Sequence, residues 1–184
     1  SPYLNNLLEP EIDDMVYLET QRGCPYHCGF CYYHKSRKKM VFANDAVVLE
    51  TVRWVHERNI SELCLVDPSL NIRPGLRNFL AEIARINKDK KIRLNAEIRA
   101  ETITPELADL FADAGFAGFE IGLQSTNQNA LAIMQRKTDA NRFLKGVSLL
   151  KERNILPRID LIVGLPGDTL VGFRESLRFV IEEN

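Results

Sequence analysis

The sequence lacks several features that would assign it to a class at once. Its 184 residues hold 24 Lys+Arg against 25 Asp+Glu, a formal net charge of −1, so it has no cationic excess of the kind that nucleic acid attracts. No run of about 18 apolar residues occurs. We therefore expect neither nucleic acid nor a membrane as a partner. With 45% hydrophobic and 27% charged residues, the composition is that of a globular domain, and we expect a cytoplasmic one.

Cysteines are also few, and their placement is uneven. The four in the chain are fewer than a disulfide-stapled secreted domain would use. Three of them, Cys24, Cys28 and Cys31, fall within eight residues, which indicates metal chemistry. Cys64 stands alone on a predicted strand, and we interpret it as a small core residue.

Predicted strands alternate with predicted helices along the whole chain. Apolar runs indicate the strands and apolar residues at helical spacing indicate the helices. The clearest helix has Thr104 as a cap, Pro105 in its first turn and Gly115 at its end. The strands are predicted at 15–20, 62–66, 92–98, 117–123 and 157–163, and the helices at 45–58, 76–88, 105–114, 139–153 and 169–182. The alternation predicts an α/β fold with a parallel sheet and right-handed crossovers.

One face of this sheet is predicted to be polar. Leu94 and Ala96 alternate with Asn95 and Glu97, and three other predicted strands repeat the pattern. Parallel strands covered by helices on both faces read instead as continuous apolar runs. A curved sheet around a polar interior, a partial (β/α) barrel, explains the alternation, and an open sheet with one solvated face is the alternative.

The cysteines lie in the segment 22–31, RGCPYHCGFC, directly after the first predicted strand. A (β/α) barrel places its active site at that end of its strands. The C-x3-C-x2-C spacing can bring three thiolates to one soft metal centre. An iron–sulfur cube held in this way would keep one iron free of protein ligands, so that a cofactor could chelate it. Structural zinc, with His34 as the fourth ligand, is the alternative.

This segment resembles the cluster-binding signature of the radical S-adenosylmethionine (radical SAM) superfamily. The resemblance implies that Cys24, Cys28 and Cys31 each bind one iron of a [4Fe–4S] cluster and that SAM chelates the fourth iron. An electron from the reduced cluster would then cleave SAM to a 5′-deoxyadenosyl radical. Phe30 matches the aromatic position beside the cluster. The resemblance further implies a small-molecule substrate and an electron donor such as flavodoxin or ferredoxin.

Two later stretches resemble the family's cofactor contacts on the fourth strand and beyond it. The segment 120–125, EIGLQS, resembles the motif that lines the methionine and ribose of SAM, and it implies contacts from Gln124 and Glu120. Arg136 resembles an arginine that pairs with the SAM carboxylate in the porphyrin-type branch. A guanidinium suits such a bidentate contact.

Two further positions complete the resemblance, which runs from residue 16 to residue 168. The segment 161–168, LIVGLPGD, resembles the fifth-strand motif whose backbone and isoleucine flank the adenine, and it implies Ile162 and Gly164 as contacts. Asp67 ends the second predicted strand, where the family contacts the methionine amine, but the usual Gly-Gly-Glu pattern is missing there.

The start of the chain and the loop 28–33 resemble the branch that carries an upstream cobalamin-binding domain, such as magnesium-protoporphyrin monomethyl ester cyclase. Cobalamin would then be a cofactor of a longer parent protein, acting in methyl transfer or ring chemistry on an unidentified substrate. We expect residues 1–14 to be a linker and 15–184 to be a radical SAM core with five of six βα units, truncated before the sixth strand. Such a fragment can be inactive alone.

Some interpretations stay open. Glu97 and Arg99 either pair with each other inside the barrel or contact substrate or cofactor. We interpret the basic run 35–39, KSRKK, as a solvated loop. In a zinc-stabilised binding module without radical chemistry it would be the contact surface, and a generic barrel enzyme with incidental cysteines is the third possibility.

Overall fold

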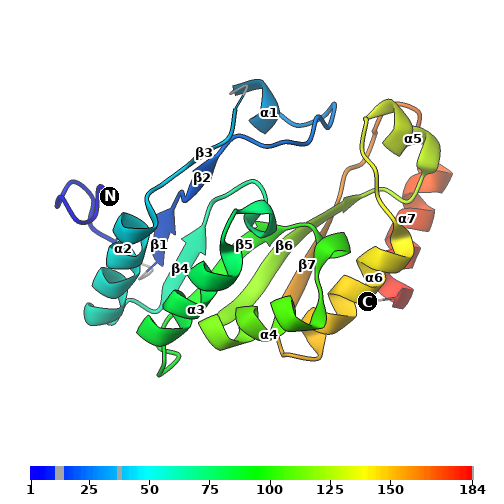
Figure 1. Ribbon diagram of the computed structural model, residues 1–184. Helices are drawn as coiled ribbons and strands as arrows, with labels where there is room; N and C mark the ends of the chain where they lie inside the picture. The colour runs from blue at the N-terminus through cyan, green and yellow to red at the C-terminus, as the bar shows by residue number, and fades with distance from the viewer. Residues whose placement is uncertain (11–14, 37–38, 184) are drawn as a thin grey trace.

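The computed structural model describes residues 1–10, 15–36 and 39–183. Its centre is a parallel five-stranded sheet in the order β1-β4-β5-β6-β7 (Figure 1). The strands are β1 (Met15–Leu18), β4 (Glu62–Leu65), β5 (Arg93–Ile98), β6 (Phe116–Gln124) and β7 (Leu156–Leu161). All five predicted strands are present, so the α/β prediction with a parallel sheet is confirmed.

Helices follow the strands, as predicted. The five long ones are α2 (Asp45–Glu57), α3 (Leu76–Ile86), α4 (Pro105–Ala114), α6 (Ala140–Lys151) and α7 (Leu170–Glu183). In α4 the Thr104 hydroxyl accepts the Leu107 N–H at 3.3 Å, and Gly115 ends the helix at φ 95°, the left-handed conformation that glycine adopts without a steric penalty. The helix boundaries of α4 are therefore those that the sequence predicts.

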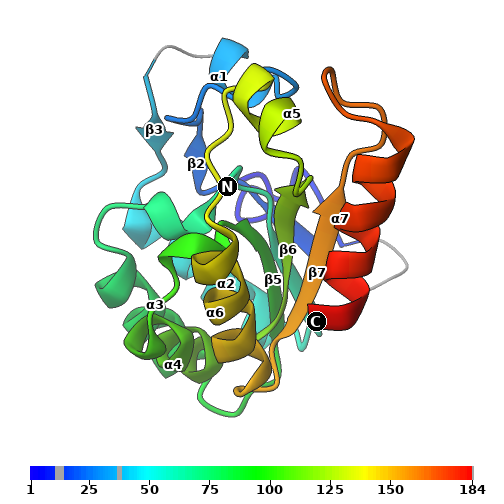
Figure 2. The same cartoon turned by 90° about the vertical axis from the view of Figure 1, so that its right-hand side faces the viewer.

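Several short elements were not predicted. The strands β2 (Gln21–Arg22) and β3 (Val41–Phe42) form an antiparallel pair, and α1 (Tyr33–Ser36) and α5 (Gln128–Ile133) are single short helices. The 3₁₀ helices η1 (Leu70–Ile72) and η2 (Ala100–Thr102) follow β4 and β5. Figures 1 and 2 show both α1 and α5 at the end of the sheet to which the strands point. This end carries the cysteine segment.

The two faces of the sheet differ as the alternation predicts. Leu63 and Leu65 of β4, Leu94 and Ala96 of β5 and Ile121 of β6 are at most 3% exposed and pack in the core beneath the helices. Burying each large apolar side chain contributes roughly 1.5–3 kcal/mol. Between them, polar side chains face a cavity of about 300 Å³ that Tyr17, Asn95, Glu97, Glu120 and Arg158 line.

Cys64 corrects one prediction. It lies on β4 between Leu63 and Leu65, so the pleat turns its thiol to the opposite face from theirs. Cys64 is half-buried and lines the polar cavity; it is not a core residue.

The amino-terminal segment contacts the domain. Tyr3 is 7% exposed, its hydroxyl donates to the Tyr17 carbonyl at 3.2 Å, and its ring centroid lies 5.7 Å from that of Trp54. The predicted division into 1–14 and 15–184 stays a prediction, because residues 11–14 fall outside the described chain. In the basic run 35–39, Lys35 belongs to α1. Positions 37–38 lie outside the described residues.

Candidate functional site

The cysteine loop, residues 22–31, is held in place by contacts at both of its ends. At its base, β2 pairs with β3, and Gly23 takes φ 93° against the Lys39 carbonyl, where an added Cβ would lie at 3.3 Å. At its tip, the Gly29 N–H donates to the Met134 carbonyl at 2.8 Å, just past α5. The loop therefore spans the carboxyl ends of the strands with its position fixed on both sides.

The three cysteines line one cavity of about 140 Å³ above the sheet. Cys28 is 6% exposed, Cys24 and Cys31 are half-buried, and all are free thiols. Burial raises the pKa of the Cys24 thiol. Seven of the ten predicted site residues line this cavity: Cys24, Cys28, Cys31, Phe30, Glu120, Gln124 and Arg136.

The thiols are not arranged around a single ion. Within residues 1–10, 15–36 and 39–183, no three His, Cys, Asp or Glu side chains are grouped to hold one metal ion. A tetrahedral zinc site needs each sulfur about 2.3 Å from the ion, whereas a four-iron cube takes each thiolate on a different iron and spreads the ligands apart. The arrangement therefore does not support the zinc alternative, which needs Cys24, Cys28, Cys31 and His34 around one ion.

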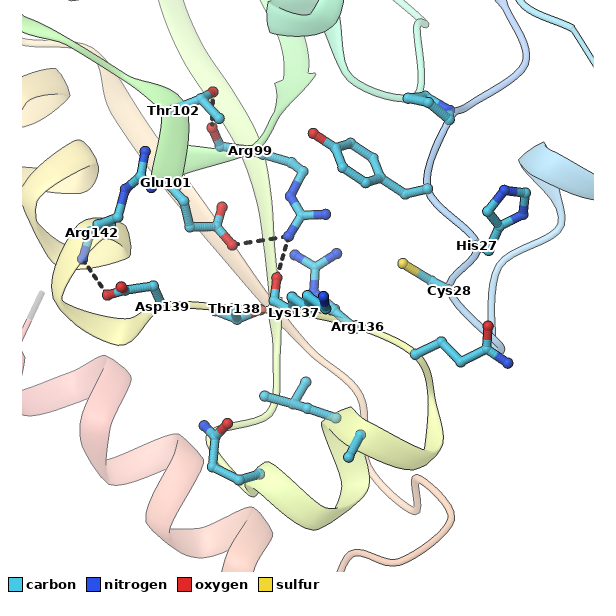
Figure 3. Close-up of a pocket in the computed structure, with 16 residues that line it drawn as sticks. His27, Cys28, Arg99, Glu101, Thr102, Arg136, Lys137, Thr138, Asp139 and Arg142 are labelled. Carbon is cyan, nitrogen blue, oxygen red and sulfur yellow. Dashed lines mark hydrogen bonds and ion pairs between the residues drawn. The ribbon is translucent and has the colours of Figure 1, made fainter.

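Arg136 enters the cavity from the segment after α5. It is 9% exposed, and its guanidinium donates to the Gly122 carbonyl. Figure 3 shows its guanidinium and the Cys28 sulfur facing each other. Its Nε has no hydrogen-bond partner among the described residues. A buried donor without a partner is uncommon in a native structure and calls for an explanation, which a bound carboxylate would supply.

Gln124 is held in an unusual backbone conformation. It ends β6 at φ 73°, a left-handed conformation that few residues other than glycine adopt and that clusters at functional sites. Its carbonyl accepts the Ile162 N–H at 2.9 Å, beyond the regular ladder between β6 and β7. The turn in the backbone places the Gln124 side chain in the cavity beside Arg136.

Carboxylates gather below the cysteines. Glu97 lies on β5 and Asp160 on β7, and both line the cavity with Glu120. Burial, and then the charges of Glu120 and Asp160, raise the pKa of Glu97 to about 7. Asp160 has no predicted role, although its place in the polar alternation of β7 could have indicated one.

Arg99 settles one open interpretation. Its guanidinium pairs with Glu101 at 3.1 Å, donates to the Lys137 carbonyl at 2.6 Å and lies 4.2 Å from the ring centroid of Tyr26. The predicted alternative in which Arg99 pairs with Glu97 is therefore wrong. Arg99 instead joins three segments, namely η2, the cysteine loop and the chain after α5.

The structure does not bring Asp67 into the cavity. Its buried carboxylate accepts the backbone N–H groups of Thr20 at 2.7 Å and Gln21 at 2.8 Å, as well as the Thr20 hydroxyl. Arg73 donates to the Thr20 carbonyl at 3.0 Å from the other side. Asp67 thus fixes the two residues that lead into the cysteine loop. These bonds also end β1 at Leu18, two residues before the predicted end.

Ile162 and Gly164 follow β7 and lie beside the cavity without lining it. Gly164 takes φ 78°, and an added Cβ would meet no atom within 4 Å. The loop is tied back through Asp168, which accepts from the Asn127 amide at 2.9 Å and the Ser125 hydroxyl at 3.2 Å. The predicted contacts of Ile162 and Gly164 stay predictions.

A second, larger cavity of about 1150 Å³ lies on the outer side of the cysteine loop (Figure 3). The cysteine loop, η2, α5 and the start of α6 enclose it. Tyr26, Cys28, Arg99 and Arg136 line both cavities and separate them. A single layer of side chains therefore stands between the inner cavity and the outer one.

Comparison with known proteins agrees with this geometry. Residues 18–180 match the sequence profile of the Radical SAM superfamily. The chain is 27% identical over 179 residues to ribosomal protein uS12 methylthiotransferase RimO of Clostridioides difficile (strain 630), covering 91% of this chain and 40% of that protein. It is 30% identical over 174 residues to 2-(S-pantetheinyl)-carbapenam-3-carboxylate methyltransferase of Streptantibioticus cattleyicolor, covering 89% of this chain and 25% of that protein.

A solved structure shares the fold. The radical S-adenosylmethionine methyltransferase TsrM of Kitasatospora setae superposes with a TM-score of 0.84 at 21% identity, over 92% of this chain and 34% of TsrM. The chain thus spans well under half the length of the proteins that it matches. Across the described residues, no helix is both long and apolar enough to cross a membrane.

Proposed function

Because the chain belongs to the radical SAM superfamily, we propose that it is an enzyme core that binds a [4Fe–4S] cluster and SAM and acts on a small-molecule substrate. Bound together, the two cofactors supply a one-electron cleavage of SAM that yields a 5′-deoxyadenosyl radical. The observation that carries the proposal is the convergence of three free thiols, Phe30 and three predicted SAM contacts on one cavity.

The cluster is proposed on Cys24, Cys28 and Cys31. The residues fit it, because the three thiols surround a cavity and yet do not gather around one point. Phe30 lines the cavity beside them and is 36% exposed, so its ring shields part of the site from water. Low solvent exposure is one of the factors that set the reduction potential of such a cluster.

Arg136 is proposed to hold the SAM carboxylate. Its unpartnered Nε and its guanidinium facing Cys28 support this assignment, because a guanidinium binds a carboxylate through two parallel hydrogen bonds. Gln124 and Glu120 would then lie along the methionine and ribose, and Glu97 and Asp160 add carboxylates able to accept hydrogen bonds from ribose hydroxyls.

The substrate is proposed to enter the polar cavity of about 300 Å³ below the cofactor site. Glu97 and Glu120 line both that cavity and the inner one, so a molecule bound there would lie next to SAM. For the full-length protein we propose methyl transfer with cobalamin from a domain outside these residues. The carbapenam-3-carboxylate methyltransferase and TsrM, which was solved with cobalamin and a [4Fe–4S] cluster, support this choice. The ring chemistry that the sequence resemblance also allows is the competing outcome for the full-length protein.

Anaerobic reconstitution with iron and sulfide tests the cluster. We expect a brown protein with about four iron atoms per chain, and loss of that colour in Cys28→Ala. Cys64→Ala is the matched control, because Cys64 is a free thiol outside the cluster cavity, and it should load normally. Stoichiometric zinc without iron uptake would refute the proposal.

Reduction of the loaded protein in the presence of SAM tests the chemistry. We expect 5′-deoxyadenosine, measured by chromatography and mass spectrometry, and none from the Cys28→Ala variant. A protein that holds a full cluster and binds SAM but yields no 5′-deoxyadenosine would contradict the proposed activity while leaving the cofactor sites in place.

A further inference from the structure

The outer cavity, of about 1150 Å³, is large enough for a whole small molecule, because pockets that bind such molecules usually measure about 300–1,000 Å³. Five consecutive residues, 135–139, line it between α5 and α6, and residues of η2 and of the cysteine loop line it as well (Figure 3). The cysteines and predicted SAM contacts of the proposed function converge on the inner cavity. They therefore leave the outer cavity without an assigned ligand.

Two cationic side chains of the outer cavity are available to an anion. Four cations and two acids line the cavity, namely Arg99, Arg136, Lys137 and Arg142 with Glu101 and Asp139. Arg99 is paired with Glu101 at 3.1 Å, and the Asp139 carboxylate caps α6 by accepting the Arg142 backbone N–H at 3.0 Å. Lys137 and Arg142 are exposed, and neither forms an ion pair with a carboxylate of the described residues. Lys and Arg both bind phosphate groups through charge-assisted hydrogen bonds.

The Glu101 carboxylate has one oxygen without a partner. Its side chain is 10% exposed and pairs with Arg99 through Oε1, whereas Oε2 has no hydrogen-bond partner among the described residues. Buried polar groups are normally hydrogen-bonded, and an ionised carboxylate can only accept. A simple anion would place a second negative charge beside this oxygen. The ligand therefore needs an N–H or O–H donor in addition to its anionic group.

A second buried polar atom and a set of apolar side chains restrict the ligand further. Thr138 Oγ1 is buried and has no hydrogen-bond partner among the described residues, and a hydroxyl can accept as well as donate. Leu131 is 2% exposed, and Pro25, Ala132 and the ring of Tyr26 line the cavity with it. Such apolar and aromatic side chains suit a planar aromatic group, with the few polar atoms fixing its orientation.

We propose that the outer cavity is a binding site for a nucleoside phosphate whose base carries an amino group, such as a guanosine phosphate. One molecule of this class combines an anion, N–H donors and a planar ring. Lys137 and Arg142 bind its phosphate, and the base donates to Glu101 Oε2 and to the Thr138 hydroxyl. The inference goes beyond the proposed function, because none of these four residues lines the inner cavity and the binding requires no cluster.

Isothermal titration calorimetry of the unloaded protein tests the ligand class with three probes: guanosine monophosphate (GMP), guanosine and inorganic phosphate. We expect GMP to bind at one site per chain, about ten-fold or more tightly than either of the other probes, because each of them satisfies only part of the lining. Inorganic phosphate that binds as tightly as GMP would overturn the nucleoside assignment. Guanosine that binds as tightly would overturn the phosphate contact, and absence of GMP binding would overturn the site.

A double variant tests the location of the site. In Lys137→Gln/Arg142→Gln we expect the GMP affinity to fall by about ten-fold or more, because both charged contacts to the phosphate are lost. Arg77→Gln/Lys88→Gln is the matched control, because both residues are exposed, neither lines the cavity, and the change in net charge is the same. An equal loss in the control would show attraction by net charge alone. That result, or an unchanged affinity in the cavity variant, would overturn the proposal.

A single variant tests the contact with the base. Thr138→Val removes the hydroxyl at nearly constant size, and we expect the affinity for GMP to fall by about five-fold while the affinity for inorganic phosphate stays the same. Stability should change little, since the hydroxyl has no hydrogen-bond partner in the protein to lose. An unchanged GMP affinity, or an equal loss for both probes, would contradict the proposed contact.

Discussion

Two buried arginines serve the two ends of the cysteine loop, and they are used differently. Arg73 is 5% exposed and donates to the Thr20 carbonyl and hydroxyl and to Asp45, and it lies 4.6 Å from the ring centroid of Phe79. Arg136 is 9% exposed, and its guanidinium bonds to the Gly122 carbonyl and to the Cys28 thiol, while its Nε has no partner among the described residues. The guanidinium of Arg73 makes its bonds within the protein, whereas Arg136 still has a donor, Nε, that could bind a ligand.

The carboxylates around them follow the same division. The Asp67 carboxylate accepts hydrogen bonds from the backbone N–H groups of Thr20 and Gln21 in a buried network. Glu97, Glu120 and Asp160 line one cavity together with Arg99 and Arg136, and no ion pair is found between these three acids and a cation among the described residues. Buried polar groups cost free energy unless they are paired, so the unpaired set is tolerated for a reason other than stability. Hydrogen bonds of Asp67 and Arg73 therefore fix the base of the cysteine loop, whereas the residues on its inner side keep polar atoms available for a ligand.

The largest effect on stability is expected from removing Asp67 at the base of the cysteine loop. Asp67→Ala removes the buried acceptor of two backbone N–H groups and of the Thr20 hydroxyl, while Arg73 keeps its ion pair with Asp45. We expect the free energy of unfolding to fall by about 3–5 kcal/mol, because three buried donors lose their partner, measured by urea denaturation of the unloaded protein. A fall of less than about 1 kcal/mol would show that the network does not anchor the loop.

A smaller and different effect is expected on the binding side. Arg136→Gln should weaken SAM binding to the loaded protein by about ten-fold or more, because a hydrogen bond between charged groups contributes roughly 1.5–3 kcal/mol. Stability should change by only about 1 kcal/mol, since the bonds to Gly122 and Cys28 are lost within the protein while a buried charge is also removed. Equilibrium dialysis with labelled SAM measures the first quantity and urea denaturation the second. A large loss of stability with unchanged SAM affinity would reverse the comparison.

The smallest effect concerns pH. The pKa of Glu97 is raised to about 7 by burial and by Glu120, so between the ordinary glutamate range and pH 7 the folded state holds a proton that the unfolded state has released. Stability therefore falls as pH rises through that window. Because Glu97 is partly exposed, solvent screening reduces the effect to about 1 kcal/mol. Urea denaturation at pH 5 and pH 8 should show this fall in the wild type and lose it in Glu97→Gln.

Local signals explain what the sequence could predict. Each cap of α4 bonds a residue at most four positions away, Thr104 to Leu107 and Gly115 to Phe111, and the alternation of Leu94 to Glu97 follows from the pleat of one strand. The three cysteines fall within eight residues of one loop, so their proximity could be predicted from the sequence alone. Phe30 lies beside them in the chain and lines the same cavity, and its contact with a cluster stays a prediction.

Side-chain contacts that depend on the tertiary structure could not be predicted from such local signals. Arg99 lies two residues from both Glu97 and Glu101 in sequence, and only the turn into η2 decides that Glu101 is the partner. Cys64 sits on an apolar strand, and its face depends on register with β1 and β5. Asp67 resembles a cofactor contact by position, yet Thr20 and Gln21, 47 and 46 residues away, take its oxygens first.

These bonds also set an order of events during folding. The loop that carries the cysteines cannot take its shape until β4 has paired with β1 and delivered Asp67 beneath Thr20. Contacts between residues so far apart in sequence form late, because closing the intervening loop costs entropy before the contact stabilises it. We therefore expect the thiols to come together only after the scaffold beneath them has formed, so that iron and sulfide would enter the proposed site on a folded chain.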